Sequence, residues 1–290
     1  MANYNNAKYI KEAIKSILSQ TYSNWELIIV DDCSEDNSLE FINEYLSDPR
    51  IKLIIHEKNQ GCGATKKTAA DNASNDILGV LDADDKLHPT ALAVMAKAYQ
   101  DNPNCGLIYS TMWDCDSELK NCKVNTWIGP TIPEKSNIFK ISISHFKTFS
   151  RNTYLKTLGF DPKQKKAVDK DIIFQLEEVT DLKYVNQPLY YYRQHTGGIS
   201  QSNKHFKSDY YHYYAKLKAY KRRYNKKIPN LSKEEIYMEY YKMVIYRLRR
   251  FLIRIFRTLN LSVLIKSILN LLPASFIPLK SKGRILKIIL

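Results

Sequence analysis

Three acidic side chains follow one short apolar run and offer the most evident chemistry in the sequence. Asp82, Asp84 and Asp85 come directly after residues 77–81, within the string LDADDKLHP. Carboxylates at this density can hold Mg²⁺ or Mn²⁺, and such an ion can offset the charge on a diphosphate leaving group. An Asp-rich turn can equally cap the helix that we expect to start near Pro89. From these residues alone both interpretations stay open.

A second acidic pair ends another apolar run. Asp31 and Asp32 follow residues 26–30, which read ELIIV, and precede a polar turn. In open sheets of parallel strands, binding sites lie at the carboxyl ends of the strands. If residues 26–30 and 77–81 are such strands, both acidic groups open onto one crevice. The alternative for Asp32 is an ordinary polar turn residue.

Short apolar runs alternate with helical segments over the first part of the chain. Apolar residues at three- and four-residue spacing predict an amphipathic helix over residues 6–20. Alternation of buried strands with helices predicts βαβ units, and so an α/β fold with a mainly parallel, doubly wound sheet. Strands are expected at 26–30, 51–55, 77–81 and 106–110, and further helices at 39–46, 61–73 and 89–99.

Charge is distributed unevenly along the chain. Of the 44 Lys and Arg and the 30 Asp and Glu, residues 1–200 hold 23 and 26, and residues 201–290 hold 21 and 4. The first part is therefore mildly acidic and the last part strongly basic, which indicates a basic appendage and not a basic protein. We expect no nucleic-acid partner, because phosphate contacts would leave the apolar side chains of the basic part unused.

The five cysteines indicate neither a disulfide framework nor a zinc site, because their number is odd and no two have CxxC spacing. Reduced cysteines and a cytoplasmic location are expected. The N-terminus has no apolar signal core, and no run reaches about 18 uninterrupted apolar residues. The sequence therefore predicts neither secretion nor a membrane span.

Several motifs occur in a fixed order along the chain. They are YNNAKYIKEAIKSILSQTYSNWELIIVDDCSEDNS, NQGCGATKKTAADNASNDILGVLDADDKLHP, SHFKTFSRNTYLKTLGF, AVDKDIIFQLEE and PLYYYRQHTGGIS. This set resembles the family 2 glycosyltransferases over about residues 4–201, most closely over 4–113. The resemblance implies a Rossmann-like GT-A catalytic domain over 1–204, with a nucleotide-binding half (about 1–113) and an acceptor half (about 114–204). It also implies transfer of a sugar from a UDP-sugar donor.

The resemblance assigns residues to the donor side of the site. Asp32 matches the residue that reads the nucleotide base, usually uracil, since a carboxylate there can accept the ring N–H. Asp82 and Asp84 match the DxD element, with Asp84 as the direct ligand of Mn²⁺ or Mg²⁺ and Asp82 as a contact to ribose or metal. Tyr4 is expected to contact the donor. The glycine turn just before Lys66 and Lys67 makes one of these two lysines a further candidate, and Lys66 is preferred.

On the acceptor side, an inverting displacement needs a base for the acceptor hydroxyl. Asp169 aligns with the catalytic carboxylate of the family, and its neighbour Asp171 cannot share its helix face. Asp169 can also be an N-cap, and the two roles are compatible. His145 is a weaker candidate for orienting the acceptor or the base, as is Asp85 for the acceptor side. Either can instead serve the structure alone.

The string RQHTGGIS places Arg193 and His195 before two glycines that permit a mobile loop. Such a loop could close over the donor, with Arg193 on the diphosphate and His195 at the metal, and exclude water. The alternative is an ordinary turn.

The start of the chain departs from the family pattern. Members normally begin with an apolar strand before the motif that here reads Ala2-Asn3-Tyr4-Asn5. We therefore expect the first strand to be missing, with a central place in the sheet empty or the true start lying upstream. An alternative function follows, namely a catalytically impaired binding partner that keeps the fold.

Residues 205–290 are expected to form a basic, amphipathic helical tail. Arg247, Arg250, Arg254 and Arg257 fall on one side of a predicted helix whose other side is apolar. Helices of this kind lie in the interface of anionic membranes. Residues of about 235–290 would then hold the enzyme at the inner face of the membrane, near a glycan or lipid-linked acceptor of bacterial surface polysaccharide synthesis. Packing on the catalytic domain or on a second subunit is the alternative.

Overall fold

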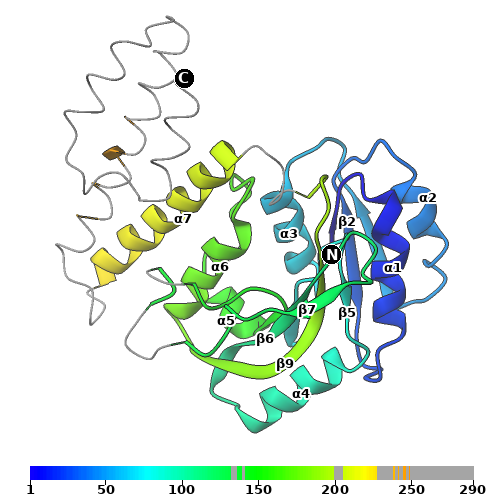
Figure 1. The fold of residues 1–290 in the computed structure, drawn as a ribbon, viewed down its shortest axis with the longest axis horizontal. Coiled ribbons are helices and arrows are strands. Elements are labelled where there is room, and N and C mark those ends of the chain that lie inside the picture. Colours follow the sequence, from blue (N-terminus) through cyan, green and yellow to red (C-terminus); the bar gives the residue numbers. More distant parts are fainter. Residues whose placement is uncertain are drawn as a thin grey trace, which may run out of the picture. The chain divides into compact units, whose positions relative to one another are not determined.

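A computed structural model gives the fold of the chain (Figure 1). It describes residues 1–131, 136–138, 141–198 and 205–226, and five single positions between 238 and 248. The chain divides into two compact units, Met1–Asn230 and Leu231–Leu290. The account below is of the first unit. The predicted membrane-binding helix, with its four arginines, lies outside the described residues.

Helices and strands alternate over the first hundred residues, as expected, so the predicted α/β class is confirmed. The helices are α1 (Ala7–Leu18), α2 (Ser38–Asn43), α3 (Cys62–Asp71), α4 (Ala91–Asp101), α5 (Arg151–Leu155), α6 (Val168–Glu177) and α7 (His205–Lys226). The strands are β1 (Ala2–Asn3), β2 (Leu27–Asp31), β3 (Ile51–Ile55), β4 (Ile77–Gly79), β5 (Lys86–Leu87), β6 (Cys105–Cys115), β7 (Cys122–Val124), β8 (Lys147–Ser150) and β9 (Asp181–Arg193).

The strands form two groups with different pairing. In the order β1-β2-β3 all neighbours are parallel, as the helical crossovers between them require. In the order β4-β8-β6-β9-β5, with β7 also paired to β6, β6 and β9 are parallel and the other neighbours are antiparallel. The first group is thus wholly parallel, and the second group, which includes β4 and β5 of the predicted nucleotide-binding half, mixes both directions.

The expected absence of a first strand is corrected by the structure. Ala2 and Asn3 pair with Val30 and Asp31 of β2, and Ala2 also bridges to Asp82 in parallel. The Met1 ammonium donates to the carbonyl oxygen of Ile28. Strand β1 therefore occupies the central position of the sheet, between β2 and Asp82, at the end that faces the site.

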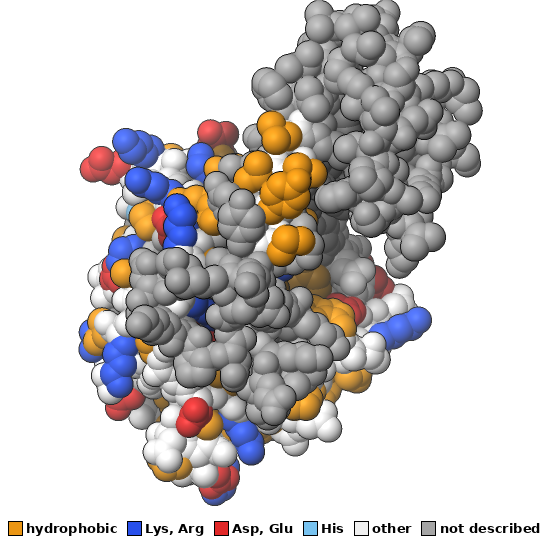
Figure 2. Space-filling model, turned by 90° about the vertical axis from the view of Figure 1, so that its left-hand side faces the viewer, with side chains coloured by type: hydrophobic (Ala, Val, Ile, Leu, Met, Phe, Trp, Pro, Cys, Tyr) orange, Lys and Arg blue, Asp and Glu red, His pale blue; other side chains and the backbone are white. Residues whose placement is uncertain are grey.

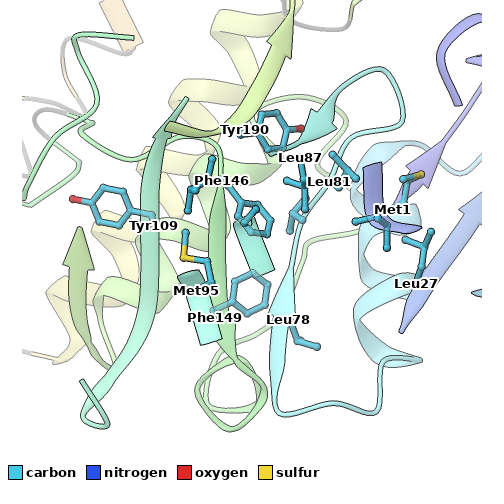
Figure 3. Packing of buried hydrophobic residues seen from close by; sticks show 14 of the residues in the cluster. Met1, Leu27, Leu78, Leu81, Leu87, Met95, Tyr109, Phe146, Phe149 and Tyr190 are labelled. Carbon is cyan, nitrogen blue, oxygen red and sulfur yellow. The ribbon is translucent and has the colours of Figure 1, made fainter. Parts of the chain in front are cut away.

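The core lies between these strands and the helices that cover them. Ile10, Ala13 and Ile14 of α1 are fully buried, since they share one helix face. Figure 3 shows Phe146 and Phe149 gathered with other large apolar side chains beside the strands of the second group. An apolar cavity of about 320 Å³ remains in the core, lined among others by Met1, Leu27, Leu78, Val80 and Phe146. β1 thus fills only part of the space between β2 and residues 77–81.

Helix α7, at the start of the predicted tail of residues 205–290, belongs to the first compact unit, which ends at Asn230. Helices α6 and α7 run side by side (Figure 1) and are joined by ion pairs. Lys218 lies 2.7 Å from Asp161 and 2.8 Å from Asp171, and Arg223 lies 2.8 Å from Glu177.

Charged side chains of both signs are interspersed on the described surface shown in Figure 2.

One disulfide corrects the expectation of reduced cysteines. Cys115 and Cys122 lie directly opposite each other in the antiparallel pair of β6 and β7, and their sulfurs are bonded. Sequence spacing alone did not reveal the pair, because six residues lie between the two cysteines and only the hairpin brings them together. Cys33, Cys62 and Cys105 are free.

Gly63 offers a test of how α3 packs against the chain before α6. A Cβ atom at Gly63 would overlap the carbonyl oxygens of Asp161 and Gln164, which cannot yield without moving the backbone. We expect Gly63→Ala to lower the free energy of unfolding by about 1–3 kcal/mol, measured by urea denaturation. Gly129→Ala is the control, because nothing lies within 4 Å of its Cβ position. Equal stability of the two variants would contradict the packing.

His212 predicts a dependence of stability on pH. Burial, with Lys170 and Lys216 nearby, lowers the pKa of His212 to about 4, and Lys170 donates to its Nδ1 at 2.9 Å. Between pH 6.5 and 4 the unfolded chain therefore binds a proton that the folded chain excludes, so stability falls as pH falls through this window. We expect the urea midpoint to fall over this range, and less steeply in His212→Gln. An identical slope in the two proteins would contradict the assignment.

Candidate functional site

Distant segments of the sequence meet at the carboxyl end of β1. Asp82 follows β4 and bridges to Ala2. Lys66 projects from α3, Asp169 from the first turn of α6, and Lys147 is the first residue of β8. The position agrees with the rule that sites in such sheets form where the strands end.

Lys66 joins the two predicted carboxylates. Its Nζ lies 2.9 Å from Oδ1 of Asp82 and 2.9 Å from Oδ1 of Asp169. The lysine side chain is 6% exposed, whereas the two aspartates are 28% and 24% exposed. Asp82 and Asp169 are thus both more exposed than the buried cation that joins them.

Lys147 is a site residue that the sequence analysis missed. Its Nζ lies 3.1 Å from Oδ2 of Asp169, and its side chain is 1% exposed. His145, two residues earlier, stacks on Tyr190 and Tyr192 at centroid distances of 4.6 and 5.7 Å. A lysine within an apolar strand, in SHFKTF, was the available signal, since a buried lysine needs an acidic partner.

The surroundings of Asp169, Asp82 and His145 lower the pKa values of all three side chains. Burial alone would raise the pKa of Asp169, but the ammonium groups of Lys147 and Lys66 outweigh it and hold the pKa well below the usual range. The pKa of Asp82 is lowered as well. Burial would raise it, but the nearby positive charges, mainly that of Lys66, together outweigh burial. Burial and Lys147 lower the pKa of His145 to about 4, so this imidazole is neutral near pH 7. The site thus holds two carboxylates, two ammoniums and a neutral histidine.

Asp84 and His195 form the second predicted group. His195 Nε2 lies 2.9 Å from Oδ2 of Asp84, and the role of the two as ligands of one ion stays a prediction. The ring of His195 also packs on Tyr9 of α1, at a centroid distance of 4.8 Å. The turn after β9 therefore contacts both the Asp82–Asp85 cluster and α1.

Arg193 is buried and makes several directed contacts within the protein. Its guanidinium donates to the carbonyl oxygens of Asp84 and Ser117 at 2.7 and 2.6 Å, pairs with Glu12, and lies over the ring of Tyr9. These contacts fix the backbone at the metal-site candidate Asp84. The predicted contact of Arg193 with the diphosphate stays a prediction.

Asp85 is 1% exposed and anchors the same turn. One oxygen accepts from the Tyr190 hydroxyl and the other from the backbone N–H of Arg193, both at 2.7 Å. Burial, together with the charges of Asp84 and Asp82, raises the pKa of Asp85 well above its usual value. The geometry gives Asp85 the turn-ordering role that was left open as its alternative.

Asp32 lies one strand away, because β1 separates β2 from Asp82. Its carboxylate accepts from the backbone N–H groups of Gln60 and Gly61 at 2.9 and 2.7 Å, and it lies 2.7 Å from His56 Nδ1. Asp32 therefore holds the turn that opens α3. Tyr4, at the end of β1, is 44% exposed and available to a ligand.

A divalent cation fits part of this arrangement. Asp82, His145 and Asp169 each offer one ligand atom, all within 4.8 Å of one another, but Lys66 and Lys147 already neutralise the two carboxylates. Asp84 and His195 offer an oxygen and a nitrogen side by side, the donor types that Mn²⁺ accepts. The Asp84 end of the cluster therefore suits an ion better than the Asp169 end.

Comparison with known proteins now identifies the class. Residues 1–158 match the family model described as Glycosyl transferase family 2. The chain is 31% identical over 232 residues to WcaA of Escherichia coli K12, named as a colanic acid biosynthesis glycosyl transferase, covering 75% of this chain and 80% of that protein. The chain therefore belongs to glycosyl transferase family 2.

Other relatives are larger than the part they share with this chain. It is 30% identical over 211 residues to the chondroitin synthase of Escherichia coli, covering 70% of this chain but 30% of that enzyme. Among solved structures, TarS of Staphylococcus aureus in complex with UDP aligns with a TM-score of 0.61 at 18% identity, covering 76% of this chain and 63% of that one. The mannosyltransferase PcManGT of Pyrobaculum calidifontis, in complex with GDP-Man and Mn²⁺, aligns with a TM-score of 0.56 at 15% identity, covering 83% of this chain and 67% of that one. These likenesses show the GT-A fold.

Arg193→Lys tests the support of Asp84. A lysine keeps the charge but cannot donate in three fixed directions, so the contacts with Asp84, Ser117 and Glu12 cannot all persist. We expect a loss of about 2–4 kcal/mol in the free energy of unfolding by urea denaturation. Arg151→Lys, at the half-buried start of α5, serves as control. A loss no larger than that of the control would contradict the supporting role.

Proposed function

We propose that this chain is an inverting glycosyltransferase that moves a sugar from a UDP-sugar to a hydroxyl group of a glycan or lipid-linked acceptor. The observation that carries the proposal is the pairing of Asp169, on the first turn of α6, with Asp82 through the single ammonium of Lys66. A base for the acceptor and a carboxylate of the donor side thus share one site.

Several relatives support the class of product. Besides WcaA and the chondroitin synthase, a teichuronic acid biosynthesis glycosyltransferase named TuaG in Bacillus subtilis is 36% identical over 85 residues. TarS has been solved with UDP and with UDP-GlcNAc. We infer a role in the synthesis of bacterial surface polysaccharide and propose a UDP-sugar as donor.

The reaction is a single displacement at the anomeric carbon. The acceptor oxygen forms a bond to that carbon while the bond to the diphosphate oxygen breaks, and UDP leaves with the bonding electron pair. Asp169 takes the proton of the acceptor hydroxyl, as a base must within hydrogen-bond reach. His145 is neutral near pH 7, stacks on Tyr190 and has its Nε2 3.9 Å from Oδ2 of Asp169, and it is proposed to orient the acceptor.

On the donor side, Tyr4 is proposed to stack on the base and Asp32 to read it, with Lys66 and Arg193 facing the diphosphate. Asp84, Asp82 and His195 are proposed to hold a divalent cation, Mn²⁺ or Mg²⁺. When bound, the cation offsets the charge that develops on the leaving diphosphate.

The place of action remains a proposal as well. No helix among the described residues is long and apolar enough to cross a membrane. We propose that the chain works at the cytoplasmic face and is held there peripherally by residues of about 235–290. Because reduction would open the Cys115–Cys122 bridge, assays belong in both reducing and non-reducing buffer.

One observation favours the alternative of a catalytically impaired binding partner. Both oxygens of Asp169 are engaged by lysine ammoniums, an arrangement that opposes action as a base unless one lysine moves. Such a partner would bind UDP without releasing it from a UDP-sugar. Turnover separates the two functions.

The test is release of UDP from a panel of UDP-sugars, with and without MnCl₂, in the presence of candidate acceptors. We expect Asp169→Asn to lower kcat about 10²–10⁴-fold with UDP binding retained, because the base is lost and the residues of the donor side are unchanged. Asp84→Ala is expected to remove the dependence on metal and to weaken UDP binding. Asp71→Asn is the control, since Asp71 is exposed and pairs only with Lys67 among the contacts described.

Calorimetry with UDP completes the design. Binding without turnover on any donor would favour the impaired partner. A wild-type chain that binds no UDP in the presence of Mn²⁺ would defeat the proposed function altogether.

A further inference from the structure

Both oxygens of the proposed base are held by cations. Lys66 Nζ lies 2.9 Å from Oδ1 of Asp169, and Lys147 Nζ lies 3.1 Å from Oδ2. A carboxylate oxygen that accepts from an ammonium is a weaker proton acceptor than a free one. Asp169 would therefore act as a base more readily if one of the two lysines withdrew.

The two lysines differ in how firmly they are placed. Lys147 stands in β8, which is paired on one side with β4 and on the other with β6, and its side chain is 1% exposed. Its ammonium also lies 3.5 Å from His145 Nδ1, at the limit of a hydrogen bond. Lys66 reaches from α3 on a flexible side chain and is shared equally between Asp169 and Asp82. Lys66 can leave Asp169 without losing every partner.

Charge balance makes this exchange depend on the donor. Asp82 and Asp169 carry two negative charges, and Lys66 and Lys147 carry two positive ones, so this group of four is balanced without ligand. A nucleoside diphosphate brings further negative charge beside Asp82. An ammonium at this edge is then drawn toward the phosphate oxygens, which accept charge-assisted hydrogen bonds.

We propose that Lys66 is the exchangeable member of this pair: the diphosphate of the donor draws its ammonium from Asp169 Oδ1, while Lys147 stays on Oδ2. Lys66 thereby couples donor binding to release of the base. Lys147 is a positioning residue that fixes the orientation of the carboxylate. The inference rests on the proposed function and adds an order to it, since the acceptor meets a competent base only after the donor has bound.

Structures of the full chain test the exchange directly. We expect a crystal structure without ligand to keep Lys66 on Asp169. A structure with UDP and MnCl₂ is expected to show Lys66 Nζ on a phosphate oxygen and beyond hydrogen-bond distance of Asp169, with Lys147 still on Oδ2. Bound UDP with Lys66 unmoved would overturn the inference.

Kinetics separate the two lysines. We expect Lys66→Met to raise the dissociation constant of UDP and the KM for the donor about tenfold or more, because a phosphate contact is lost. Lys147→Met is expected to lower kcat about 10²–10³-fold with UDP affinity unchanged. Lys147→Arg should recover much of kcat, since a guanidinium can hold the same carboxylate oxygen. Lys97→Met is the control, because Lys97 is an exposed lysine of α4 that pairs with Asp101.

The variants also keep the outcomes distinct. Equal loss of UDP affinity in Lys66→Met and Lys147→Met would overturn the division of roles. If Lys147→Met fails to fold, as judged by circular dichroism, Lys147→Arg and the two structures still decide. A wild-type chain that binds no UDP would defeat the proposed function, whereas UDP binding with Lys66 unmoved would defeat only this inference.

Discussion

Two lysine ammoniums buried against two aspartates hold the centre of this fold together. The two lysines stand in different elements, Lys66 in α3 and Lys147 in β8. The aspartates are Asp82, after β4, and Asp169, in α6, so each pair joins elements distant in sequence. Taking charges out of water is costly, and the pairing offsets that cost only while the geometry is kept. The positions of two helices and two strands are thus tied to the same contacts that build the site.

The first helix and the strands that follow it were predictable, because their sequence signals are local. Apolar spacing over residues 6–20 gave α1, and the runs at 26–30 and 51–55 gave β2 and β3. The acceptor half was not predictable in the same way. Strands β6, β8 and β9 pair residues that lie 38 to 78 positions apart in the sequence, antiparallel for β8 and parallel for β9. No short window of sequence contains that information.

The same contrast divides the site. Asp82, Asp84 and Asp169 stand in recognisable strings, and the structure brings Asp82 and Asp169 to one cation and Asp84 to His195. Lys147 also stands in such a string, SHFKTF, but its pairing with Asp169 depends on the register of β8. The bond between Cys115 and Cys122 likewise depends on strand pairing. Partners set by tertiary contact are what sequence patterns cannot supply.

The hairpin between β6 and β7 has a consequence for how this protein can vary. Surface hairpins commonly tolerate insertions, because their tips touch little else. Here the carbonyl oxygen of Ser117 accepts from Arg193, which also holds the backbone of Asp84, and Cys115 and Cys122 close the base of the loop. An added residue at this tip would shift a support of the cluster itself. The loop is therefore a poor place for insertions, tags or grafted sequences, although it lies at the surface.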